Sequence, residues 1–488
     1  MSAAVSDRIE AHVWRISFVV IIGSIMSILD TTIVNVALEK LGTDLHKSIA
    51  NTQWVITGYM LSLAAVIPVT GWAARRFGAK PVYLLSLVLF IAGSALCGLA
   101  QSLDQLIVFR VIQGIGGGMI LPLGQLMMAT AAGPKRMGRV MSIVAIPAML
   151  GPILGPTLGG LILDNASWRW IFYINLPIGL IAFLLSLRTL PRVERAPTHR
   201  LDLRGLLLMA TGLPLFTYGL AEIGTTGSFT ATRVLLPGLA GIALVALFAV
   251  YALRIPQPLL DLRLYRRATF ASASVTMFCL GAALFGAMIL MPLYWQQIRF
   301  ESVVKTGLLT APLGLGMALV MPFAGRLADR VGGGPLALAG VIVTTVATIP
   351  FGFIGAHTSI VGLSIAMFVR GLGVGLAFMP AMSAAFASLR PSELADATPQ
   401  LNVLQRVGGS IGTAVLAVVL SRALTGTHGI AAAAGAYGTA FWWSLGLTAL
   451  AIIPCIVLVR AERAARAAGG NERLSPSAEA ELLAEAVA

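Results

Sequence analysis

Charged residues are scarce in this sequence. Of its 488 residues, 11% are charged and 57% are hydrophobic, whereas an average soluble domain carries about 25% charged residues. This deficit excludes an ordinary soluble globular protein and indicates a chain that lies mostly in a membrane. The net charge of +14 does not indicate nucleic-acid binding. The basic residues form short clusters between apolar segments, as in loops that face an anionic membrane surface.

Other absences narrow the function. The three cysteines, at 97, 279 and 455, are so far apart that they indicate neither a disulfide framework nor a metal site. No phosphate-binding G-x-x-x-x-G-K-[ST] motif is present, which argues against ATP-driven transport by this chain. The sequence also offers no metal-ligating cluster and no nucleophile–base pair. We therefore expect no enzymatic activity, no metal and no cofactor.

Long apolar segments dominate instead. A membrane-spanning helix needs about 20 mostly apolar residues. The segments predicted to span lie near 16–38, 52–72, 82–100, 105–127, 140–163, 170–187, 205–222, 234–253, 270–293, 307–325, 336–356, 359–380, 401–420 and 438–459. Lys and Arg are concentrated in the N-terminus, in the loops after even-numbered segments and in the C-terminal tail. This bias and the even number of segments predict that both termini are cytoplasmic.

Parts of the chain repeat. GWAARRFGAKP (71–81) returns as GRLADRVGGGP (325–335), an offset of 254 residues, and GIGGG from Gly114 returns as GLGVG from Gly371, an offset of 257. Such a parallel repeat predicts two bundles with a substrate site between them near the membrane midplane. The predicted parts are a cytoplasmic N-terminus (1–15), a six-helix bundle (16–188), a linker with two extra helices near 205–222 and 234–253 (189–267), a second six-helix bundle (268–460) and a cytoplasmic tail (461–488).

One acid lies inside the first apolar segment. Asp30 is the only charged residue between Ile16 and Leu38, and a carboxylate at that depth is costly. At 100° per residue it lies beside a polar stripe that contains Ser27 and Asn35, so we expect it to face a cavity. There it would exchange a proton, attract a cationic substrate, or do both in competition. The alternative is a structural Asp that accepts hydrogen bonds from nearby hydroxyls.

An arginine lies inside the fourth segment. Arg110 cannot lose its charge, so it needs a carboxylate, carbonyl groups or water nearby. Under one interpretation it pairs with an acid such as Asp30 and couples the proton state of that acid to the position of the bundles. Under the other, it extends towards the outer membrane surface.

Several motifs resemble those of one family. LDTTIVNVAL (29–38), GWAARRFGAKP, RVIQGIGGG (110–118), GPILGPTLGG (151–160) and WRWIFYINLPIG (168–179) are similar to signatures of the major facilitator superfamily, in particular its fourteen-span drug:proton antiporter branch. The resemblance implies an all-α membrane protein of two six-helix bundles plus two inserted helices. Two positions depart from the family. The family usually has Asp where this chain has Arg75, although the second copy keeps Asp329, and it usually has Pro where this chain has Glu39.

The residue types and the resemblance together give the expected sites. Proton coupling is assigned to Asp30 and Arg110. The substrate-binding candidates are Asn35, Gln53, Trp54, Tyr59, Gln113, Asn175, Trp295, Gln296 and Asn402. The gating candidates are Gly71, Arg75, Arg76, Gly78, Gly325, Asp329 and Arg330. The antiporter motif consists of Gly151, Pro152, Gly155, Pro156 and Gly159, and it predicts either a kinked contact between the bundles or ordinary close packing.

We therefore expect a proton-coupled multidrug or antibiotic exporter that works by alternating access and uses the proton gradient. Its expected partners are protons, the lipid bilayer and a small amphipathic or cationic substrate. The expected form is a monomer in the inner (plasma) membrane of a bacterium. An exporter of a metabolite, siderophore or lipid is the first alternative, because a fold does not fix a substrate. A non-transporting membrane sensor is the second.

Overall fold

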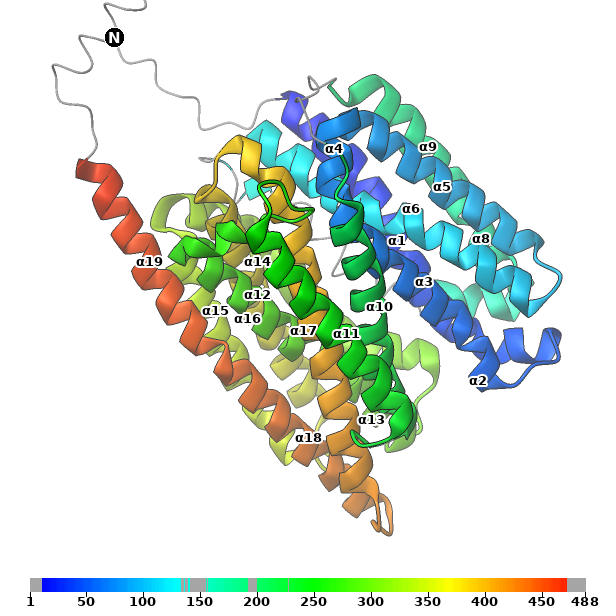
Figure 1. Ribbon diagram of the computed structural model, residues 1–488. Helices are drawn as coiled ribbons and strands as arrows, with labels where there is room; N and C mark the ends of the chain where they lie inside the picture. The colour runs from blue at the N-terminus through cyan, green and yellow to red at the C-terminus, as the bar shows by residue number, and fades with distance from the viewer. Residues whose placement is uncertain are drawn as a thin grey trace, which may run out of the picture.

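The described part of the protein is entirely helical. The computed structural model describes residues 11–132, 136, 139–140, 155, 157–191, 200–226 and 228–471, and these residues contain no β-strand. The helices lie roughly side by side (Figure 1). They are α1 (Ala11–Asp44), α3 (Trp54–Val66), α4 (Thr70–Phe77), α5 (Ala79–Leu99), α6 (Leu103–Ala132), α9 (Asn175–Thr189), α10 (Leu203–Thr226), α11 (Thr232–Arg254), α12 (Ala268–Met288), α13 (Leu290–Gln297), α14 (Val303–Val331), α15 (Gly333–Thr348), α16 (Ile360–Ala387), α17 (Leu394–Leu424), α18 (Ile430–Leu450) and α19 (Ile452–Asn471). Short elements connect them, namely α2 (Ile49–Thr52), η1 (Ile67–Val69), α8 (Trp170–Tyr173), η3 (Leu262–Arg266), η4 (Ile349–Phe353) and η5 (Pro391–Glu393).

Most of these helices can cross a membrane. Thirteen helical segments are long and apolar enough to do so. The other predicted segment, near 140–163, lies mainly outside the described residues, but 157–165 is helical. The helical content and the spans confirm the predicted all-α membrane fold.

Glycines allow close packing in the N-terminal bundle. A Cβ added at Gly116 would overlap the backbone of Phe90 in α5, and one added at Gly118 would overlap the backbone of Leu63 in α3. The glycine-rich stretch of α6 therefore lets two neighbouring helices approach it from different sides.

The inserted helices touch both bundles. α10 and α11 pack against each other, and α10 also contacts α3 and α17. Towards the N-terminal bundle, Tyr218 of α10 stacks on Trp54 with ring centroids 5.6 Å apart. Towards the C-terminal bundle, Ile223 belongs to one apolar cluster with Ala414 and Val418 of α17. The inserted pair thus covers one side of the junction between the bundles (Figure 1).

The sequence repeat is visible in the backbone. Gly78, between α4 and α5, has φ 90°, and Gly332, between α14 and α15, has φ 107°. Such angles favour glycine, which has no Cβ to clash. The two positions are 254 residues apart, so each copy of the repeated loop makes the same turn.

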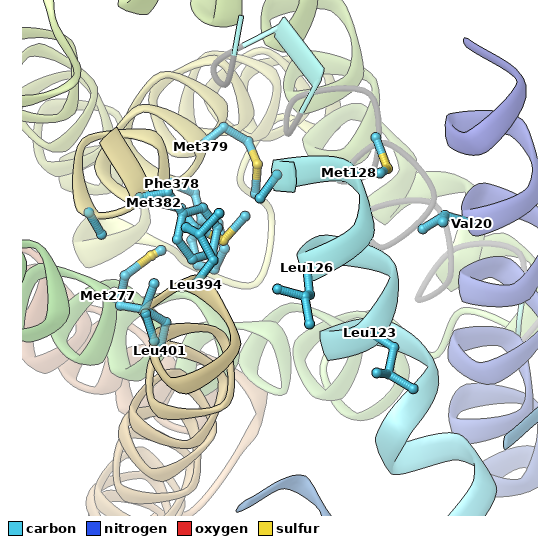
Figure 2. Packing of buried hydrophobic residues seen from close by; sticks show 14 of the residues in the cluster. Val20, Leu123, Leu126, Met128, Met277, Phe378, Met379, Met382, Leu394 and Leu401 are labelled. Atoms are coloured by element: carbon cyan, nitrogen blue, oxygen red, sulfur yellow. The ribbon is translucent and has the colours of Figure 1, made fainter. Parts of the chain in front are cut away.

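One end of the assembly is sealed by apolar side chains. A single cluster includes Leu126 and Met128 of α6 together with Phe378 and Met382 of α16 and Leu394 of α17 (Figure 2). This cluster crosses from one bundle to the other, near the loops that follow even-numbered spans. At that end the two bundles are closed on each other.

The charge bias predicts that this sealed end is cytoplasmic. We expect a membrane-impermeant maleimide to label Gln101→Cys in intact cells, and to label Arg390→Cys only after permeabilisation, because the two exposed positions lie at opposite ends of the helices. The three native cysteines are buried, so labelling of the unmodified protein measures the background. Labelling of Arg390→Cys in intact cells would contradict the predicted orientation.

Candidate functional site

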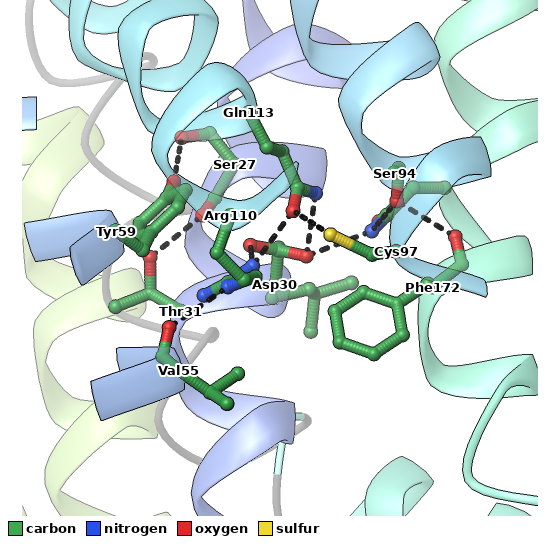
Figure 3. Close-up of polar contacts among 12 residues, drawn as sticks. Ser27, Asp30, Thr31, Val55, Tyr59, Ser94, Cys97, Arg110, Gln113 and Phe172 are labelled. Atoms are coloured by element: carbon green, nitrogen blue, oxygen red, sulfur yellow. Dashed lines mark hydrogen bonds and ion pairs between the residues drawn. The ribbon is translucent and has the colours of Figure 1, made fainter. Parts of the chain in front are cut away.

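The acid of α1 lies in a closed polar cage. Asp30 is 0% exposed. One carboxylate oxygen accepts a hydrogen bond from Arg110 Nη1 at 2.6 Å, and the other accepts from Gln113 Nε2 at 2.9 Å and Asn175 Nδ2 at 3.0 Å (Figure 3). The carboxylate is therefore paired and fully bonded, which is what burial of a charge requires.

The arginine is held as firmly as the acid. Arg110 Nη1 also donates to Gln113 Oε1 at 2.8 Å, and its Nε donates to the Val55 carbonyl at 3.2 Å. Its guanidinium carbon lies 4.1 Å from the centroid of the Tyr59 ring, a cation–π contact. Arg110 thus pairs with Asp30 and does not extend to the membrane surface.

A second layer fixes the amides of the cage. Asn175 also donates to Ser94 Oγ at 3.0 Å, and Ser94 donates to the Phe172 carbonyl at 2.9 Å. Cys97 donates to Gln113 Oε1 at 3.6 Å. Six helices, α1, α3, α5, α6, α8 and α9, contribute to this one network. Its members all come from the N-terminal bundle.

The prediction that Asp30 faces an open cavity is wrong for this conformation. Arg110, Gln113 and Asn175 cover the carboxylate, so no surface of it remains exposed. Two of these residues, Gln113 and Asn175, were expected to bind substrate, but their amides are occupied by Asp30. The helical periodicity of α1 did not show that neighbouring helices would supply matching polar groups.

The remaining substrate candidates do not form one cavity. Trp295 is 0% exposed within the apolar core of the C-terminal bundle. Asn35, Gln53 and Gln296 are exposed, and Asn35 bonds to its own helix at the Thr31 carbonyl. Trp54 stacks on α10, as described above. Aromatic and amide side chains in the sequence therefore did not, by themselves, identify the residues that line a substrate cavity.

Asn402, another substrate-binding candidate, makes a contact between the two bundles. Its Nδ2 donates to Gln125 Oε1 at 2.7 Å, and Asn402 and Gln125 are 3% and 6% exposed. Because Gln125 lies on α6 and Asn402 on α17, this bond joins the two bundles in a buried place.

Two ion pairs join the bundles near the sealed end. Arg75 of α4 pairs with Asp396 of α17 at 2.5 Å, and Arg139 pairs with Asp329 of α14 at 3.5 Å. Each pair links a residue of the N-terminal half to one of the C-terminal half. We call these two pairs the latch.

The latch follows the repeat with inverted charge. Arg75 and Asp329 are 254 residues apart, and Arg139 and Asp396 are 257 apart, which are the two offsets of the repeat. Equivalent positions thus hold bases in the first half and acids in the second. Arg75, which departs from the family loop, therefore has a matching partner. The sequence analysis missed Asp396 and Arg139, although the repeat offset could have found them.

The other gating candidates are placed around the latch. A Cβ at Gly71 would overlap the Ala395 carbonyl oxygen. Because glycine has no Cβ, the backbones of the two bundles can be in direct contact at this position. Gly325 is buried, whereas Arg76 and Arg330 are exposed. Gly78 makes the turn described above. Within the described part of the chain, two of the predicted charged gate residues pair across the bundles, Arg75 with Asp396 and Asp329 with Arg139.

The antiporter motif is only partly described. Gly151, Pro152 and Pro156 lie outside the described residues. A Cβ at Gly155 would overlap Thr32 of α1, and one at Gly159 would lie 3.0 Å from Ile33. These two glycines therefore pack against α1 within their own bundle, as the interpretation of ordinary close packing predicts.

Comparisons with known proteins agree with this architecture. The model of the Major Facilitator Superfamily matches residues 20–413. The chain is 40% identical over 418 residues to the "Multidrug resistance protein B homolog" of Mycobacterium tuberculosis, covering 85% of this chain and 77% of that protein. It is 31% identical over 400 residues to "Multidrug export protein EmrB" of Escherichia coli K12, covering 81% and 77%. The solved structure of the proton:xylose symporter XylE superposes with a TM-score of 0.64 at 14% identity, covering 91% and 95%.

These findings define the class. The chain belongs to the Major Facilitator Superfamily, as its motifs predicted. Its relatives include proteins named for multidrug resistance and multidrug export. The membrane-spanning helices and the bacterial relatives identify a multi-pass inner-membrane protein.

The cage makes Asp30 and Arg110 energetically interdependent. We expect Arg110→Gln to destabilise the protein by about 3–5 kcal/mol, because it leaves a buried carboxylate without its counter-charge. Adding Asp30→Asn should recover at least about 1 kcal/mol of that loss. Denaturant unfolding in detergent measures both, with the exposed Arg76→Gln as control. Strictly additive effects would show that the two side chains do not interact.

The latch makes a charge-exchange prediction. Arg75→Asp or Asp396→Arg alone places like charges together, so each should open the sealed end and raise the labelling rate of Leu126→Cys by about fivefold, which corresponds to about 1 kcal/mol. The double exchange should return the rate to within about twofold of the starting protein. Arg76→Asp, at an exposed neighbouring position, is the matched control. A double exchange that labels faster than either single variant would refute the latch.

Proposed function

We propose that this protein is a proton-coupled multidrug exporter that works by alternating access. The observation that carries the proposal is the Asp30–Arg110 pair, an ionisable carboxylate buried at 0% exposure in a membrane-spanning helix. Ionisable groups at this depth are typical of proton pathways. The relatives named for multidrug export support the direction and the breadth of transport.

The cage supplies a reason for coupling. A proton on Asp30 removes the counter-charge of Arg110, and Arg110 cannot discharge itself. The bonds from Arg110 to Gln113 and Val55 and the ring of Tyr59 then have to carry an unpaired buried cation, which is unfavourable. Protonation therefore favours a different packing of α1, α3 and α6. Proton binding is linked in this way to the arrangement of helices rather than to direct contact with substrate.

The latch distinguishes the two states of the proposed transport cycle, one with its ion pairs formed and one with them separated. In this conformation the ion pairs and the apolar cluster close the end that carries the even-numbered loops. With the cytoplasmic orientation that the charge bias predicts, this is a state closed to the cytoplasm. Substrate entry from the cytoplasm requires the Arg75–Asp396 and Arg139–Asp329 pairs to separate. The side chains of Arg75 and Asp396 are 25% and 20% exposed, which makes the separation of that pair inexpensive.

The proposal predicts a specific loss in Asp30→Asn. The amide keeps hydrogen bonds within the cage but cannot take up a proton, so proton-driven efflux should fall at least about 100-fold if this one step limits coupling. Downhill exchange of substrate between the two sides should continue. Proteoliposomes with and without an imposed pH gradient measure both rates. Normal proton-driven efflux by Asp30→Asn would remove this residue from coupling, and absence of transport by the unmodified protein would overturn the exporter function.

A further inference from the structure

Three faces of α17 can be distinguished by their contacts. A Cβ at Gly408 or Gly412 would overlap a carbonyl oxygen of α12, so this face packs tightly on that helix. Val403 and Val407 pack against the apolar cluster of the inserted helices. The face between them carries Asn402, which bonds to α6 of the other bundle. This last face therefore points into the junction between the two bundles.

Arg406 lies on the same face as Asn402. The two residues are four apart in one helix, so their side chains point in nearly the same direction, one turn apart. Arg406 also lies within electrostatic reach of Tyr59, on the far side of the junction. Its side chain is partly exposed. The sequence analysis assigned it no role, because it matches none of the family motifs.

No described residue supplies a counter-charge or a hydrogen bond to Arg406. Away from the two ends of the bundles, the charged residues of the described helices are Asp30, Arg110, Arg370 and Arg406. Asp30 is committed to Arg110, and Arg370 is buried against α12, where it donates to the Ala283 carbonyl at 3.4 Å. Three positive groups and one negative group leave this region with a net charge of +2. A guanidinium in such a place attracts an anion and disfavours a cation.

We propose that Arg406 is the binding group for an anionic substrate. It would hold the carboxylate, sulfonate or phenolate of an amphipathic aromatic compound at the junction of the bundles. This inference rests on the proposed exporter function, and it replaces the expected cationic substrate with an anionic one. The guanidinium fork suits a carboxylate because it can donate two parallel hydrogen bonds.

The membrane potential favours this choice of substrate. Export of an anion removes a negative charge from the cell, and entry of a proton adds a positive one. Both steps therefore make the cell interior more positive. An inside-negative potential therefore drives both steps. A cationic substrate would instead leave against the potential and would have to approach Arg406 in a region without a free acid.

Binding to the purified full-length protein in detergent tests the site without requiring transport. The probes are naphthoate, its uncharged methyl ester and the cation tetraphenylphosphonium. We expect Arg406→Gln to weaken naphthoate binding at least about tenfold and to change ester binding by less than about twofold, because only the carboxylate uses the charge. Arg406→Lys should retain most of the affinity. Arg422→Gln, at an exposed position of the same helix, is the matched control and should have no effect.

The outcomes separate the site from the function. Equal losses for naphthoate and its ester, or no loss for either, would overturn the role of Arg406. Preferential binding of tetraphenylphosphonium by the unmodified protein would overturn the anionic substrate class. Binding of naphthoate through Arg406 without efflux from proteoliposomes would keep the site and reject the exporter function. Efflux that persists unchanged in Arg406→Gln would keep the exporter and reject the site.

Discussion

The buried ion pair of Asp30 and Arg110 is the constraint on which the N-terminal bundle depends. A carboxylate and a guanidinium at this depth each lose their hydration, and only their mutual contact and further hydrogen bonds offset that loss. The amides of Gln113 and Asn175 complete the set. Because these groups come from several helices, the helices cannot shift relative to one another without exposing an unpaired charge. The packing of the bundle thereby depends on one buried ion pair.

The latch is built from the same kinds of groups but in a different environment. The side chains of Arg75 and Asp396 are 25% and 20% exposed, whereas those of Arg110 and Asp30 are 1% and 0% exposed. Partly exposed pairs contribute about 0–1 kcal/mol, and breaking a buried pair costs about 3–5 kcal/mol. The Arg75–Asp396 contact is therefore less costly to break than the Asp30–Arg110 contact. Burial, rather than the number of ion pairs, determines which contact opens.

The fold and the partners of the buried charges were predictable to different degrees. Apolar segment length predicted the helices, and the repeated loop contains Gly78 and Gly332, which make matching turns, because these features follow from local sequence. The contact between Asp30 and Arg110 was one of two open interpretations, since single-helix periodicity does not say what a neighbouring helix presents. Tertiary packing decided that Gln113 belongs to Asp30 and that Trp295 is core. Arg406 matched no motif, and only the contacts of α17 place it at the junction between the bundles.

The two halves share a fold but not their charges, and this difference assigns them separate tasks. At the repeat offset of 257, Arg110 corresponds to Met367 and Arg406 corresponds to Met149. At the two offsets, Asp30 corresponds to Leu284 or Ala287, both apolar and buried. The C-terminal half therefore has no equivalent of the Asp30–Arg110 pair. Because an apolar residue occupies the equivalent position of each of these charges, the proposed proton binding and the proposed substrate recognition each depend on residues that the other half of the repeat lacks.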